Sequence, residues 1–190
     1  MKVITLLGSS RKKGNTGTIL HWVEDQIRTM GHEVESIHLE SMDINGCLGC
    51  GKCKESQDII GCVRNDDALS ILDKMIRAQA VVFSSPLYFW GFSSQIKALI
   101  DRSYSLVVNY HQPGHFSLLE GQRLGLLITG GGPFENNAEL VFTAFDRICR
   151  YYKAERAGEL YIGPCTTPDK LDLSIKDKAM SFARKLLTAS

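Results

Sequence analysis

Apolar residues fall along this chain in two alternating patterns. Short apolar and β-branched runs predict strands over residues 3–7, 33–39, 80–83, 124–129 and 156–162. Apolar residues at helical spacing predict helices over about 16–30, 66–76, 94–108, 138–152 and 171–187, and residues 109–122 predict a loop. Asp66 stands where the second helix needs an N-cap. Strand and helix alternate five times, which predicts an α/β fold with a parallel sheet covered by helices on both faces.

Composition narrows the class of protein. Of the residues, 44% are hydrophobic and 23% are charged, which is typical of a soluble globular protein. A length of 190 residues favours one domain over residues 1–190. Lys and Arg number 22 against 21 Asp and Glu, so no strong net charge attracts nucleic acid or an anionic membrane. Apolar runs stay well short of the roughly 20 residues that span a bilayer, and the chain enters its first strand without a signal-peptide pattern. We therefore expect a cytoplasmic protein with no nucleic-acid or membrane partner.

Three unusual loops follow the first, third and fourth predicted strands, at whose carboxyl ends ligands bind in such sheets. The first loop, residues 8–16, combines small hydroxyl residues with three cations before a helix, and this combination favours an anion. Its spacing fits neither a P-loop nor the dinucleotide-binding glycine pattern, and a plain turn with a basic, solvated tip is the alternative. The second loop, residues 84–92, carries four aromatic residues, which suit a planar heterocycle, a core cap or a dimer contact. The third, residues 129–133, has three glycines that let a ligand approach the backbone.

Together, residues 8–16, 85–91 and 95–102 resemble the NADPH-dependent FMN reductase branch of the flavodoxin-like proteins. The resemblance implies a flavodoxin-like three-layer sandwich with strand order 2-1-3-4-5, non-covalent FMN and NAD(P)H as cosubstrate. By this match, the FMN phosphate would be held by Ser9, Arg11, Asn15 and Thr16. The flavin ring would be flanked by Pro86, Leu87, Tyr88, Phe89 and Trp90, with Thr129, Gly130 and Gly131 near its other edge. We interpret residues 95–102 as helix and interface rather than as catalytic.

A cysteine-rich insertion occupies about residues 41–65. Two residues separate Cys47 from Cys50, two separate Cys50 from Cys53, and eight separate Cys53 from Cys62. Four thiolates this close can hold a [4Fe–4S] cluster, while zinc is an alternative metal. The segment is similar to the iron-sulfur flavoprotein family, although the last gap is longer than in that family. The other interpretation is a cluster-free reductase in which these cysteines are free, disulfide-bonded or oxidised.

Two functions follow from these patterns. The first is an FMN enzyme that takes hydride from NAD(P)H and reduces a flavin, a quinone or another small acceptor. Such an enzyme needs no dedicated catalytic side chain, because the flavin carries the chemistry. The second is an iron-sulfur flavoprotein that exchanges single electrons with a ferredoxin-like partner. Trp90 and Phe92 exceed what one flavin ring covers, so we also expect a homodimer or homotetramer.

Overall fold

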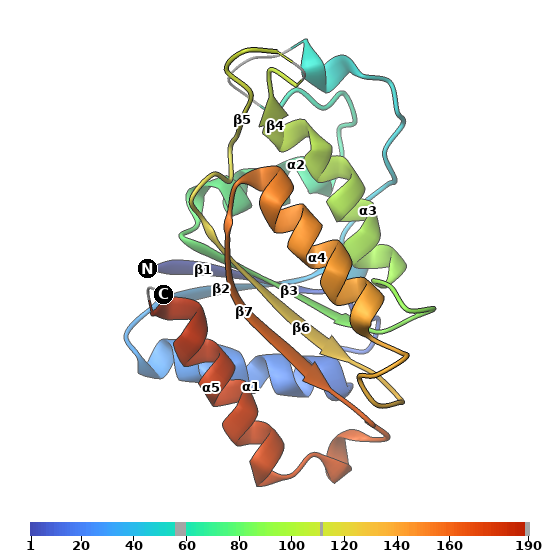
Figure 1. The fold of residues 1–190 in the computed structure, drawn as a ribbon, viewed down its shortest axis with the longest axis vertical. Helices are drawn as coiled ribbons and strands as arrows, with labels where there is room; N and C mark the ends of the chain where they lie inside the picture. Colours follow the sequence, from blue (N-terminus) through green and yellow to red (C-terminus); the bar gives the residue numbers. More distant parts are fainter. Residues whose placement is uncertain (56–59, 111, 189–190) are drawn as a thin grey trace.

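Five parallel strands form the centre of the molecule in the computed structural model, which describes residues 1–55, 60–110 and 112–188 (Figure 1). The strands lie in the order β2-β1-β3-β6-β7. They are β1 (Lys2–Leu7), β2 (Glu33–His38), β3 (Ala80–Pro86), β6 (Arg123–Thr129) and β7 (Glu155–Ile162). Because β6 and β7 are the fourth and fifth strands predicted from the sequence, this order confirms the expected 2-1-3-4-5 sheet.

Helices cover both faces of the sheet (Figure 1). On one face lie α1 (Asn15–Thr29) and α5 (Leu173–Leu187); on the other lie α2 (Asp67–Arg77), α3 (Ser94–Arg102) and α4 (Glu139–Tyr152). Alternate residues of β1 divide between the two layers: Ile4 and Leu6 pack towards α2–α4, and Val3 and Leu7 towards α1 and α5. The central strands are therefore apolar on both faces, as the continuous apolar runs predict.

The cap predicted at Asp66 is confirmed, because its Oδ1 accepts a hydrogen bond of 3.2 Å from the Ala68 backbone amide at the start of α2. The prediction of one helix over residues 94–108 is wrong beyond Arg102. There the chain forms a 3₁₀ turn, η3 (Ser103–Leu106), and then β4 (Val107–Val108), which pairs antiparallel with β5 (Phe116–Ser117). This pairing buries both valines of β4. The strand β5 also lies within residues 109–122, which were predicted to form a loop.

A second correction concerns β3, which continues through Pro86 instead of ending at Phe83. Pro86 pairs in register with Thr129 of β6, so the neighbouring strand extends β3. Serine residues 84 and 85 then lie inside the sheet, where the Ser84 hydroxyl donates to the Leu6 carbonyl at 2.6 Å.

The cysteine-rich insertion leaves the sheet after β2 and η1 (Leu39–Ser41) and returns at Asp66. It contains the short turn η2 (Lys52–Lys54), and residues 56–59 lie outside the described part of the chain. A last 3₁₀ turn, η4 (Pro168–Lys170), precedes α5. Within residues 1–55, 60–110 and 112–188, no helix has the length and apolar character that crossing a membrane requires.

Candidate functional site

The loops after β1, β3 and β6 leave the sheet at its carboxyl edge and enclose one pocket, which we call the phosphate-loop pocket. This edge includes the boundary between β1 and β3, where the strand order reverses and where ligands bind in such folds. Ten of the twelve residues predicted for FMN line the pocket: Ser9, Arg11, Asn15, Thr16, Pro86, Leu87, Tyr88, Thr129, Gly130 and Gly131. The structure thus brings together the three loops that the sequence singles out.

The loop after β1 is held firmly against the neighbouring elements. The Gly8 amide donates to the Ser84 carbonyl at 2.8 Å, and the Ser93 hydroxyl donates to the Gly8 carbonyl at 2.5 Å. A side chain at Gly8 would collide with Ile96 of α3, so only glycine lets the helix approach this closely. This packing fixes the direction in which the loop enters α1.

The start of α1 is built to receive an anion. Gly14 stands at the N-cap, no side chain caps the first turn, and that turn contains no acidic residue. The first-turn amides therefore point their positive ends towards the pocket. The Thr16 hydroxyl lies 2.7 Å from that of Thr129, which ties the start of α1 to the end of β6. Arg11 is exposed at the rim and adds a guanidinium.

The hydrogen bonds of Asn15 indicate which chemical group of a ligand would fit this part of the pocket. Its Nδ2 donates to the Thr166 carbonyl at 3.3 Å, while its buried Oδ1 has no hydrogen-bond partner within the described residues. A buried acceptor without a donor is costly, so it fits a ligand that brings a hydroxyl group. FMN carries such hydroxyls on its ribityl chain beside the phosphate. In this orientation Asn15 therefore suits the sugar-like chain better than the phosphate oxygens.

Two residues of this pocket were missed by the sequence analysis. Cys165 and Thr166 follow β7 and line the pocket beside Asn15 and Gly130. The Cys165 amide donates to the Gly130 carbonyl at 2.8 Å, and burial raises the pKa of its thiol. The available signal was the end of the fifth strand, which reaches the same edge of the sheet, but its small residues carry no distinctive motif.

Phe89 and Trp90, also predicted to flank the flavin, do not line this pocket but form the tip of a tight turn. The amide and carbonyl groups of Tyr88 and Gly91 exchange hydrogen bonds of 3.1 and 3.0 Å. The φ angles of Phe89 and Trp90 are 46° and 61°, which glycine and asparagine adopt readily and aromatic residues do not. Phe89 is 95% exposed and Trp90 53%. Two strained, solvent-facing aromatic residues are thus held beside the pocket.

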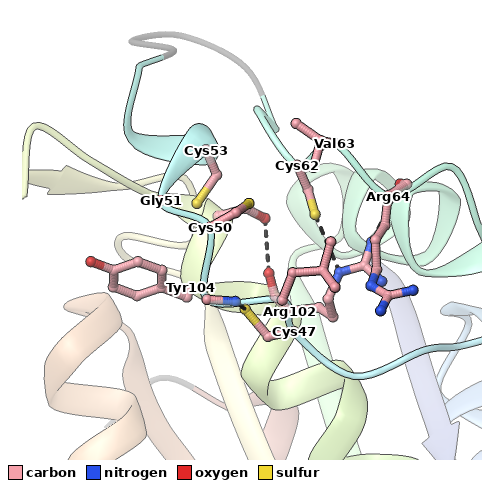
Figure 2. Close-up of a pocket in the computed structure, with 12 residues that line it drawn as sticks. Cys47, Cys50, Gly51, Cys53, Cys62, Val63, Arg64, Arg102 and Tyr104 are labelled. Atoms are coloured by element: carbon pink, nitrogen blue, oxygen red, sulfur yellow. Dashed lines mark hydrogen bonds between the residues drawn. The ribbon is translucent and has the colours of Figure 1, made fainter.

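The four clustered cysteines line a second pocket, the cysteine cavity, of about 200 Å³ (Figure 2). Cys47, Cys50 and Cys53 lie along one stretch of the insertion, and Cys62 faces them from the returning stretch (Figure 2). Gly49 and Gly51 turn the backbone between them with φ angles of 65° and 73°, and the Gly49 amide donates to Cys47 Sγ at 3.4 Å. All four are free cysteines. The donor set fits an iron-sulfur cluster, which is bound by four thiolates.

Electrostatics shows that the sulfurs influence one another. Burial raises the pKa of the Cys53 thiol, the Lys54 ammonium opposes this rise, and the charges of Cys62, Cys47 and Cys50 add to it. Within the described residues, no three histidine, cysteine or acidic side chains converge on a position for a single metal ion.

Lys54 fastens the cysteine-bearing stretch to the body of the protein. Its ammonium donates to the carbonyls of Tyr104 and Val107 at 2.5 and 2.6 Å and lies 3.6 Å from the centre of the Tyr104 ring. Burial lowers the pKa of this amine. The residue next to Cys53 is thereby anchored at the end of α3.

Sheet order and the phosphate-loop pocket define a flavodoxin-like α/β protein. The chain belongs to the NADPH-dependent FMN reductase family, which it matches over residues 1–139. An FMN-dependent NADH-azoreductase from Bacillus anthracis, solved in complex with FMN, shares the fold with a TM-score of 0.72 at 12% identity, over 99% of this chain and 100% of that one.

Curated relatives are named for a second cofactor. The chain is 40% identical over 110 residues to an iron-sulfur flavoprotein of Methanocaldococcus jannaschii, covering 58% of this chain and 55% of the relative. It is 33% identical over 132 residues to an iron-sulfur flavoprotein of Archaeoglobus fulgidus, covering 70% and 56%. The matches thus span about half the length of these relatives.

Proposed function

We propose that this chain is an electron-transfer flavoprotein that holds FMN in the phosphate-loop pocket and a [4Fe–4S] cluster in the cysteine cavity. The observation that carries the proposal is the gathering of Cys47, Cys50, Cys53 and Cys62 around one cavity. The names of the iron-sulfur flavoproteins from two archaea support it. A ferredoxin-like protein is the proposed electron partner.

The chain's own part in this function is binding and orientation. The first-turn amides of α1, the Ser9 and Thr16 hydroxyls and the Arg11 guanidinium would hold the FMN phosphate. Asn15 would accept from the ribityl chain, and Pro86–Tyr88 and Thr129–Gly131 would border the flat ring. When bound, FMN supplies two-electron hydride chemistry and a [4Fe–4S] cluster supplies one-electron transfer.

A second candidate is an NAD(P)H-dependent reductase of small acceptors such as a quinone or a flavin. The family match over residues 1–139 favours it, as does the exposed aromatic turn at 88–91, on which a nicotinamide ring could stack. The two candidates differ in the electron donor that reduces the flavin.

The first test is metal content. After anaerobic reconstitution, the unaltered chain should contain about four iron and four acid-labile sulfide per chain. Cys50→Ser should lose the cluster because it removes one of the four ligands, and it should retain FMN because the phosphate-loop pocket is unchanged. Cys149→Ser is the matched control, since Cys149 lies buried in α4 away from the cysteine cavity. Stoichiometric zinc, or no metal in the unaltered chain, contradicts the cluster.

The second step separates the donors. Oxidised protein is mixed anaerobically with NADH, with NADPH or with reduced ferredoxin, and the loss of oxidised flavin absorbance is followed. Rapid reduction by ferredoxin and slow reduction by both nicotinamides supports the electron-transfer flavoprotein. Rapid reduction by a nicotinamide supports the reductase instead.

A further inference from the structure

Arg102 is the last residue of α3, and its side chain has no solvent exposure. We expected residues 95–102 to be helix and interface, but the guanidinium of Arg102 is buried and contacts Cys62 (Figure 2). A buried guanidinium is costly unless each of its donors finds an acceptor. Its partners therefore reveal what it does.

Among the residues that the structure describes, every hydrogen-bond acceptor of this guanidinium lies in the cysteine-rich insertion or is the residue that follows it. The acceptors are the Asn45 carbonyl at 3.1 Å, Cys62 Sγ at 3.2 Å, the Arg64 carbonyl at 3.4 Å and Asp66 Oδ2 at 2.6 Å. Asn45 precedes the first clustered cysteine, whereas Arg64 and Asp66 follow the last. One side chain thus joins the two ends of the segment that carries all four thiols.

The carboxylate of Asp66 and the sulfur of Cys62 accept from different N–H groups of Arg102. Asp66, whose side chain is 4% exposed, already receives the Ala68 and Asn45 amides at 3.2 Å each. The Nε–H of Arg102 faces the sulfur of Cys62. A hydrogen bond from a charged donor is stronger than one between neutral groups, so this contact holds the Cys62 sulfur in place.

We propose that Arg102 is a positioning residue that selects Cys62 as the fourth cluster ligand and closes the insertion around the cluster. This inference rests on the proposed function. It explains how a cysteine nine positions beyond Cys53 serves as a ligand: Arg102 holds the sulfur of Cys62 at the cysteine cavity, so the length of the gap does not set the position of the thiol. The same N–H donor to sulfur makes the cluster easier to reduce.

The test compares cluster potential and iron content in reconstituted holoprotein. Arg102→Met removes the charge and all donors, so it should lose iron or shift the cluster potential to more negative values. Arg102→Lys keeps a cation for Asp66 and removes the planar donor group that faces Cys62, so it should fold and still shift the potential. We expect a change of about tenfold in the reduction equilibrium, which equals about 59 mV for one electron.

Arg123→Met is the matched control, because Arg123 is also a buried arginine in an ion pair, with Glu155 at 2.9 Å, on β6. It should cost stability without moving the cluster potential. Full iron content with an unaltered cluster potential in Arg102→Lys overturns the inference while the proposed function stands. An unaltered chain that takes up no iron overturns the proposed function itself, and the inference with it.

Discussion

At the scale of single residues, the side chains of the phosphate-loop pocket differ in whether they are already hydrogen-bonded within the protein. The Thr16 hydroxyl is hydrogen-bonded to that of Thr129, and either of the two can be the donor, while the Ser9 hydroxyl accepts from the Arg11 amide at 3.2 Å. Arg11 differs because its side chain is exposed at the rim. Its guanidinium can therefore turn to a ligand without breaking the packing of the loop.

Arg11→Ala should weaken FMN binding roughly tenfold to a hundredfold, because a hydrogen bond to a charged group contributes about 1.5–3 kcal/mol. Titration of the apoprotein with FMN, followed by flavin fluorescence, measures the change. Lys13→Ala is the control: it removes a charge from the same loop, but Lys13 lines a different pocket. Equal losses in both variants would mean that the general positive charge of the loop, and not a contact of Arg11, attracts the phosphate.

At the scale of elements, the sequence predicts best what local pattern determines. Apolar periodicity locates the five sheet strands and all five helices, and the resemblance supplies the strand order that the structure confirms. The end of α3 could not be predicted, because Tyr104 continues the helical spacing and no glycine or proline follows until Pro113. What ends α3 is the pairing of β4 with β5, a contact between residues distant in sequence.

The same distinction applies to the candidate sites. Motifs in the sequence predict the three loops that line the phosphate-loop pocket. No motif predicts Thr166, whose carbonyl accepts a hydrogen bond from Asn15 in the folded chain. Arg102 belongs to a helical motif, and nothing local to the sequence indicates that it reaches Cys62 across 40 positions. Tertiary contacts of this kind become visible only in the folded chain.

Gly17 offers a test of how tightly the loop after β1 is built. Replacing a helical glycine with alanine ordinarily stabilises a protein by up to about 1 kcal/mol. Here the new Cβ would collide with the Lys12 carbonyl, so the backbone of the loop must shift. We expect Gly17→Ala to lower the free energy of unfolding by about 1–3 kcal/mol and to weaken FMN binding.

Urea denaturation and FMN titration measure both effects of Gly17→Ala. Gly46→Ala is the control, since nothing lies within 4 Å of its added Cβ and its φ angle is outside the left-handed region. Its stability should stay close to that of the unaltered chain. A stabilised Gly17→Ala protein would show that the loop yields easily and does not hold a fixed phosphate position.

At the scale of the whole molecule, α3 separates the two candidate sites. The loop that precedes α3 borders the phosphate-loop pocket, and the residues that end it and follow it border the cysteine cavity. The exposed aromatic turn at 88–91 lies at the first of these ends. Tyr88, Phe89 and Trp90 expose 52%, 95% and 53% of their surface, and such a group of apolar side chains commonly meets a partner.

We predict that a second copy of the chain covers this turn, so that the unaltered protein is a dimer or a tetramer at micromolar concentration. Phe89→Asn combined with Trp90→Gly should weaken assembly at least about tenfold, since two large apolar side chains would no longer be buried. Asn-Gly is the preferred sequence of a turn with two positive φ angles, so the fold should be kept or stabilised.

Sedimentation velocity over a range of concentrations gives the dissociation constant. Leu173→Ser is the control, because Leu173 is 78% exposed and begins α5, the helix that covers the face of the sheet opposite to α3 (Figure 1). A monomeric unaltered chain, or equal weakening by Leu173→Ser, would mean that the strained aromatic turn serves the phosphate-loop pocket of its own chain and not a subunit contact.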